Sequence, residues 1–288
     1  MTGSTKRFIA TAITMLGLTS VASAADLPGR PYTKAPAVTS AVFDWSGYYV
    51  GGNLGGAWND SHDIVSPTGC FINPAVLCGG PLSTNPFRTD ASSLKGAGFA
   101  GGGQVGYNWQ RERWVFGIEG DINYVGINDS VATNRTLSAP LTGSWSHSET
   151  DRPGWLGTFR GRVGVTATPS FLLYATGGLA VGQVRSSSVS TFSATGDAYA
   201  GSNDDTRVGW TVGGGGEWMI APQWSIKAEY LYVDLGKSTY TANCTVAGLC
   251  TAPPIAQAAA YQTELRSHEN IARVGFNYRF GGPILAKY

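Results

Sequence analysis

The clearest pattern along this chain is a regular alternation of large apolar side chains with small or polar ones. It is best seen between positions 114 and 124, where the two faces of an extended chain differ sharply. One face carries Trp114, Phe116, Ile118, Ile122 and Tyr124, and the other carries Gly117, Glu119, Asp121 and Asn123. Successive side chains of a β-strand point to opposite sides, so this period of two predicts a strand. A soluble sandwich and a membrane barrel would both accommodate one such strand.

The same alternation recurs in eight stretches of about twelve residues. The predicted strands cover residues 46–58, 98–110, 113–126, 153–166, 171–184, 207–219, 223–235 and 269–280. Trp and Tyr stand mostly toward the strand ends, as in the aromatic girdles at the two surfaces of a bilayer. Strands of this length can cross a bilayer at a tilt, which takes about 9–11 residues.

The connections between these strands alternate in length. Short turns are predicted at 111–113, 167–170 and 220–223, and long polar segments at 59–97, 127–152, 185–206 and 236–268. This order places both termini on the short-turn side, which is the layout of outer-membrane barrels. We therefore expect an all-β fold, a closed eight-stranded antiparallel transmembrane β-barrel with four long extracellular loops and three short periplasmic turns. Closure is required because an open sheet edge in lipid would leave backbone groups unpaired.

Composition and the N-terminal segment agree with an exported membrane protein. The chain has 288 residues with 40 Gly and 14% charged residues, against about 25% charged in a typical soluble domain. Lys6 and Arg7 precede an apolar run that ends in a small-residue cleavage site, so residues 1–24 are expected to be a signal peptide cleaved after Ala24. Residues 25–44 are expected to form a periplasmic linker, and residues 45–288 are expected to form the barrel in the outer membrane.

The net charge argues against nucleic acid as a partner. The formal charge is +1, and loss of Lys6 and Arg7 with the signal peptide lowers it to −1. No excess of cations is then left to neutralise phosphates.

Four cysteines fall in two polar segments. Cys70 and Cys78 lie close in sequence, as do Cys244 and Cys250. Four cysteines allow three pairings, and we favour the two local disulfides, formed in an oxidising compartment. A four-cysteine metal site is disfavoured because no C-x-x-C spacing occurs.

The inward face of the predicted barrel carries charges of both signs. The acids are Glu119, Asp121, Glu217 and Glu229, and the bases are Arg160, Arg162, Lys227, Arg273 and Arg279. An eight-stranded barrel has an interior only wide enough for side chains to fill, and charges packed there must pair. A polar plug that stabilises the barrel is the favoured interpretation, and a narrow ion path is the alternative.

Three segments resemble a known family. Residues 43–52 (FDWSGYYVGG), 117–121 (GIEGD) and 274–280 (VGFNYRF) are similar to the small alphaproteobacterial outer-membrane barrels, a surface-antigen family of the OmpA-like barrel superfamily. The resemblance spans Phe43 to Phe280 and implies an eight-stranded barrel with an envelope-structural or surface-exposed role. Such barrels often end on an aromatic residue that the barrel assembly machinery reads. Here either Phe280 or the terminal Tyr288 is the candidate.

No motif predicts catalysis. Residues 101–106 match G-x-G-x-x-G, but a strand pattern follows where a dinucleotide site needs a helix. Residues 92–95 match S-x-x-K without the accompanying K-T-G or S-D-N. His62, His147 and His268 fall in or beside the long segments, and neighbours in sequence do not make a triad. We expect no catalytic residue, no cofactor and no metal ligand. A loop-borne enzyme site, or a metal or haem-type ligand, is the alternative that the histidines leave open.

The predicted function is that of a non-enzymatic outer-membrane barrel that contributes to envelope integrity and displays surface loops. A small porin-like channel for ions or small solutes is the alternative. The expected partners are outer-membrane lipid, lipopolysaccharide and the barrel assembly machinery, and the chain is expected to be a monomer.

Overall fold

The computed structural model describes residues 43–68, 70–73, 75–78, 90–137, 143–193, 196, 198–245 and 260–280. The predicted signal peptide, most of the predicted linker, Cys250 and Tyr288 lie outside these residues. Within them, no helix is long and apolar enough to cross a membrane.

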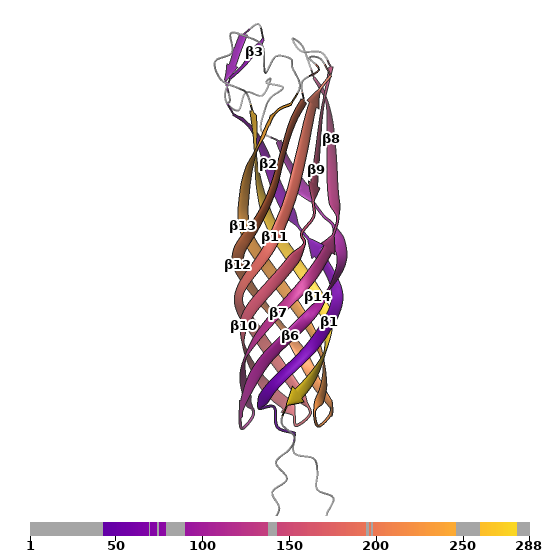
Figure 1. Cartoon of the computed structure of the whole chain (residues 1–288), viewed down its shortest axis with the longest axis vertical. Coiled ribbons are helices and arrows are strands. Elements are labelled where there is room, and N and C mark those ends of the chain that lie inside the picture. Colours follow the sequence, from indigo (N-terminus) through magenta and orange to yellow (C-terminus); the bar gives the residue numbers. More distant parts are fainter. Residues whose placement is uncertain are drawn as a thin grey trace, which may run out of the picture. The chain divides into compact units, whose positions relative to one another are not determined.

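Eight strands form a closed ring, with each strand antiparallel to its neighbours (Figure 1). In ring order they are β1 (Gly47–Asn59), β6 (Ala97–Arg111), β7 (Trp114–Ile127), β10 (Trp155–Thr168), β11 (Phe171–Phe192), β12 (Ala198–Ala221), β13 (Trp224–Cys244) and β14 (Ala260–Phe280). β14 pairs with β1 from Phe280 opposite Tyr48 to Glu269 opposite Asn59, which closes the sheet. The eight-stranded antiparallel barrel predicted from the alternation is confirmed.

Three tight turns connect strands at one end of the ring. Two residues separate β6 from β7, β10 from β11, and β12 from β13, as the short turns in the sequence predicted. Glu112, in the first of these turns, is the one non-glycine residue of the described part with a positive φ, 56°. The ring strands β1 and β14 begin and end at this same end of the barrel, where Tyr48 pairs with Phe280.

The outer face of the ring is apolar and exposed. Leu54, Phe99, Ile122 and Phe159 are each 57–63% exposed, although a soluble protein would bury side chains of this kind. Tryptophans flank the band at the strand ends, with Trp109, Trp114, Trp218 and Trp224 near the tight turns and Trp58 and Trp155 at the opposite ends. This is the exterior of a barrel that contacts lipid, with aromatic girdles at the two interfaces.

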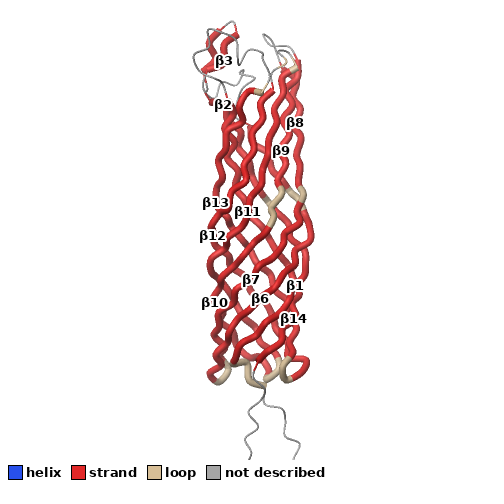
Figure 2. Tube along the Cα trace, in the orientation of Figure 1, coloured by secondary structure: helices blue, strands red, loops and turns tan. Residues whose placement is uncertain are grey.

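The long segments are not the loops that the sequence suggested. They contain β2 (Ser61–Thr68), β5 (Asp90–Leu94), β8 (Asp129–Leu137) and β9 (Gly143–Asp151), and β11 to β14 continue well past the predicted strands. β2 pairs with β14 and β5, while β9 pairs with β11 and β8. A second tier of strands therefore lies beyond the membrane ring (Figure 2). β11 to β14 run into it without a break, whereas short non-strand segments separate β2, β5, β8 and β9 from the ring strands next to them in the sequence.

We call this second tier the distal extension. It consists of β2, β5, β8 and β9 with residues 186–192, 198–205, 237–244 and 260–266 of β11 to β14. The prediction failed here because polar and apolar residues occur on both faces of these strands. In the segment 186–192 the inner face carries three serines and Phe192, and the outer face carries Ser187, Val189 and Thr191, so the alternation shows no consistent apolar contrast.

One more hairpin and the cysteines complete the described structure. β3 (Cys70–Asn73) and β4 (Ala75–Cys78) form a separate two-stranded sheet in which Cys70 lies opposite Cys78 in the backbone register. Their side chains lie outside the described part, and so does Cys250. Cys244 is disulfide-bonded.

Candidate functional site

The candidate site is the charged interior of the membrane ring. The structure places all nine predicted interior charges inside the barrel, with exposed fractions from 0% for Arg160 and Lys227 to 8% for Asp121. Each lies at an inward position of its strand, because the outward positions on either side carry the apolar lipid-facing side chains.

Glu119 on β7 is the hub of the interior network. Lys227 Nζ on β13 donates to both carboxylate oxygens of Glu119 at 2.8 Å. Tyr49 donates its hydroxyl to Glu119 Oε2 at 2.7 Å, and Arg160 binds Oε1 from the neighbouring strand β10. Four strands, β1, β7, β10 and β13, are thus joined through one carboxylate.

Arg160 and Arg273 connect the remaining acids of this group. Arg160 contacts Asp121 Oδ2 at 2.7 Å and Glu229 Oε1 at 3.1 Å. Arg273 donates from Nη2 to Glu229 Oε2 at 2.6 Å and to Asp121 Oδ2 at 3.0 Å. Charge-assisted contacts of this kind fix side-chain geometry as well as adding energy.

A second arm of the network joins Arg162 to Glu217. Arg162 Nη2 donates to Glu217 Oε2 at 2.7 Å, and its guanidinium lies 4.1 Å from the centre of the Tyr174 ring. The other oxygen of Glu217 accepts from Ser225 at 2.6 Å and from Asn277 at 2.9 Å. The ninth residue, Arg279, forms no ion pair with these four acids; its guanidinium is stacked 4.9 Å from the Trp45 ring and donates to the Asp44 carbonyl.

The connected network holds four acids and four bases. Glu119, Asp121, Glu217 and Glu229 are matched by Arg160, Arg162, Lys227 and Arg273. Such a balance is required because an unpaired buried charge costs several kcal/mol. Inward glycines make room for the large side chains. A Cβ on Gly106 would lie 2.3 Å from the Tyr49 hydroxyl oxygen, and one on Gly275 would lie 3.0 Å from Lys227 Cε.

Two apolar layers enclose this charged layer. Toward the tight turns lies a cluster of Trp45, Val115, Leu172, Tyr174 and Met219. On the distal side lies a larger cluster that includes Val125, Leu156, Leu231, Val233 and Ile271. Both sets are at most 7% exposed. Tightly packed apolar side chains hinder the entry of water, so the two layers separate the charges from the solvent at either end of the ring.

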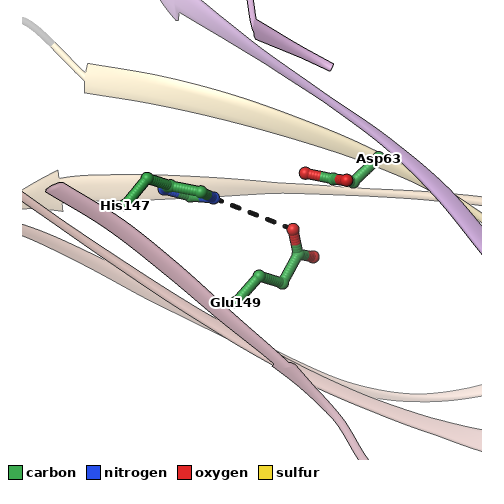
Figure 3. Close-up of side chains that lie close together, drawn as sticks. All are labelled: Asp63, His147 and Glu149. Atoms are coloured by element: carbon green, nitrogen blue, oxygen red, sulfur yellow. Dashed lines mark ion pairs between the residues drawn. The ribbon is translucent and has the colours of Figure 1, made fainter. Parts of the chain in front are cut away.

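A second polar cluster lies inside the distal extension, and sequence reasoning missed it. Asp63 of β2 and His147 and Glu149 of β9 are at most 3% exposed, and their ligand-type atoms all lie within 4.8 Å of one another. His147 Nε2 lies 3.8 Å from Glu149 Oε2 (Figure 3). His147 and Glu149 are two residues apart on one strand face, so H-x-E was visible in the sequence. Asp63 comes from a distant strand that had been taken for a loop.

Part of this cluster has the residue types of a hydrolase triad. His147 Nδ1 lies 2.8 Å from Ser190 Oγ, with Glu149 on the other ring nitrogen. Ser190 is 2% exposed and Glu149 is completely buried, so a substrate carbonyl has no access. The 3.8 Å gap between His147 and Glu149 also exceeds the hydrogen-bond reach expected between the base and the group that orients it. The arrangement therefore does not support nucleophilic catalysis. His62 is exposed, and His268 lies 3.7 Å from Asp234.

The Glu149 carboxyl is expected to make stability depend on pH. Burial and the neighbouring Asp63 raise the pKa of Glu149 from 4.5 to about 9. The folded state therefore binds one proton more than the unfolded state between these values, and stability decreases as pH rises through that range. We expect the free energy of unfolding in EDTA to fall from pH 5 to pH 9, and Glu149→Gln to reduce that slope. Glu264→Gln, at an exposed ion pair with Lys237, is the control and should leave the slope unchanged.

A closed ring with a lipid-facing exterior and a packed, charge-balanced interior defines a transmembrane β-barrel. The sequence model of the outer membrane protein β-barrel domain matches residues 10–280, and the chain belongs to this family of outer-membrane proteins.

Several curated proteins are similar to this chain. The 31 kDa outer-membrane immunogenic protein of Brucella melitensis is 37% identical over 213 residues, covering 73% of this chain and 78% of that protein. The 22 kDa outer membrane protein of Rhizobium leguminosarum is 31% identical over 61% of this chain and 70% of its own length. Among solved structures, the outer membrane protein OprG from Pseudomonas aeruginosa has a TM-score of 0.39 and 13% identity, covering 84% of this chain and all of that one. The protein is thus an outer-membrane protein, as predicted.

Proposed function

We propose that this protein is a non-enzymatic, non-conducting barrel that stabilises the outer membrane and displays a rigid β-structured extension on its surface. The observation that carries the proposal is the filled interior. A charge-balanced layer lies between two apolar layers, and an eight-stranded ring has no room for a water-filled path beside them.

The same features support the expected surroundings of the protein. The exposed apolar band, including Leu54 and Ile122, fits direct contact with the lipid chains of the bilayer. Lipopolysaccharide would face the outer girdle near Trp58 and Trp155. The ring buries all of its own edges, so a monomer suffices for stability. Assembly by the barrel machinery would read an aromatic end, and β14 ends on the outward-facing Phe280.

Single-channel recording tests the proposal. We expect the mature protein in a planar bilayer to show no steady current, or only rare small flickers, because dry apolar layers oppose the entry of ions. The Leu156→Ala variant, in which one apolar layer loses a large side chain, should also show no steady current because the layer around Trp45 remains. Insertion is verified by co-flotation of the protein with lipid vesicles. Steady openings of porin size in the unmodified protein would make it a channel and contradict the proposal.

A further inference from the structure

The inside of the distal extension is an acidic compartment. Asp63, Glu149 and Asp151 are at most 2% exposed there. The Arg and Lys side chains that the described part of the chain buries all belong to the membrane ring, and are Arg160, Arg162, Lys227, Arg273 and Arg279. Buried carboxylates are costly unless they are protonated, paired or bound to a cation.

Two of these carboxyls face each other beside an imidazole. Figure 3 shows the Glu149 carboxyl pointing toward His147 and the Asp63 carboxyl lying next to both. Glu149 Oε1 accepts from the Tyr240 hydroxyl at 3.3 Å, while Oε2 is fully buried and lies 3.8 Å from His147 Nε2. Two ionised carboxylates cannot donate a hydrogen bond to each other, so the facing Glu149 and Asp63 carboxyls must share a proton or a cation.

The imidazole is held in the orientation that a metal ligand needs. Ser190 Oγ binds His147 Nδ1 at 2.8 Å, and the Trp145 ring stacks on the imidazole with ring centres 5.5 Å apart and planes at 8°. These contacts direct Nε2 toward the carboxyls. Histidine ligands of metals are usually fixed in this way, through a hydrogen bond at the other ring nitrogen.

We propose that Asp63, His147 and Glu149 bind one divalent first-row transition-metal ion, of which Zn²⁺ is the reference case. Donor atoms bound to Zn²⁺ at about 2.0–2.2 Å in a tetrahedron lie about 3.4 Å apart, and the 3.8 Å between His147 Nε2 and Glu149 Oε2 is close to that value. One imidazole nitrogen and two carboxylates suit such ions, whereas Ca²⁺ and Mg²⁺ prefer oxygen ligands alone. The ion would neutralise the acidic compartment and join β2 to β9, which are not paired with each other in the sheet.

The test uses Zn²⁺ alone as the probe and the full mature protein folded in detergent. Calorimetric titration of the metal-free protein should show saturable binding of one Zn²⁺ per chain, and added Zn²⁺ should raise the unfolding midpoint. Co²⁺ should give a visible absorption spectrum that Zn²⁺ displaces. His147→Ala and Glu149→Gln should each weaken Zn²⁺ binding more than about 100-fold, and Ser190→Ala about 10- to 100-fold by freeing the ring.

The two other histidines supply matched controls. His62→Ala and His268→Ala should bind Zn²⁺ as the unmodified protein does. Each variant is checked for the β-sheet circular dichroism of the folded barrel. If His147→Ala does not fold, the Zn²⁺ affinity of Glu149→Gln, which keeps the shape of the side chain, is the test of the site. Absence of saturable binding to the unmodified protein overturns the proposal, since a shared proton then accounts for the carboxyl pair. Binding that survives His147→Ala and Glu149→Gln, or is lost in His62→Ala or His268→Ala, also overturns it.

Discussion

Replacing Arg160 with alanine is expected to lower the free energy of unfolding by about 3–5 kcal/mol. Arg160 is completely buried and contacts Glu119, Asp121 and Glu229 at once. Its loss leaves four acids facing three bases inside the barrel, and an uncompensated buried charge is strongly destabilising. Equilibrium unfolding of the barrel in lipid vesicles with guanidinium measures the change.

Arg185→Ala is the matched control, because Arg185 pairs with Asp204 at 3.1 Å on the outside of the barrel. Both side chains are more than half exposed, so the expected cost is at most about 1 kcal/mol. Conductance recorded on the same Arg160→Ala sample should rise little, since the apolar layers remain. Unchanged stability together with a large gain in conductance would identify the interior as an ion path and not a plug.

The membrane ring could be predicted because lipid imposes a strong requirement on its outer face. Every outward position from Trp114 to Tyr124 must be apolar or glycine, while inward positions carry Glu119 and Asp121, so the period of two is conspicuous. The three tight turns followed from the same pattern.

The partners within the charged interior could not be predicted in the same way. Which residues face inward follows from alternation alone, but contacts depend on the register of strands that are far apart in sequence. Glu119 and Lys227 meet across the barrel although 108 positions separate them. Arg279 was grouped with the network by its inward position, yet it stacks on Trp45 near the end of the ring.

The distal extension was missed because no lipid constrains it. Its outer face is exposed to solvent, so charged side chains are as acceptable there as in a loop. Two exposed ion pairs lie on it, Arg185 with Asp204 and Lys237 with Glu264. Its inner face mixes serines and acids with aromatic residues such as Trp145, Phe192 and Tyr261, so it shows no uniform polarity. The Asp63, His147 and Glu149 cluster went unrecognised for the same reason, since it exists only if these segments are strands.

Arginine substitutions at two outward positions of β11 should locate the membrane boundary. Leu179 is 58% exposed within the apolar band, and Val189 is 46% exposed in the distal extension. Leu179→Arg places a charge in hydrocarbon and is expected to cost about 2–4 kcal/mol, whereas a charge outside the bilayer costs about 0–1 kcal/mol. Both substitutions exchange a β-branched or aliphatic side chain for arginine on the outer face of the same strand, so strand propensity and the direction of the side chain do not separate them.

The measurement is the unfolding free energy of each variant in lipid vesicles, with the same pair repeated in detergent. In detergent the losses of unfolding free energy caused by Leu179→Arg and Val189→Arg should become similar, because a micelle deforms around an arginine more readily than a bilayer does. An equal cost at Leu179 and Val189 in vesicles would mean that the bilayer covers the distal extension as well. The serine-rich strands would then lie in lipid, and the surface-display role would lose its physical basis. A large difference places the boundary between residues 179 and 189, near the level at which β11 exchanges its neighbour β10 for β9.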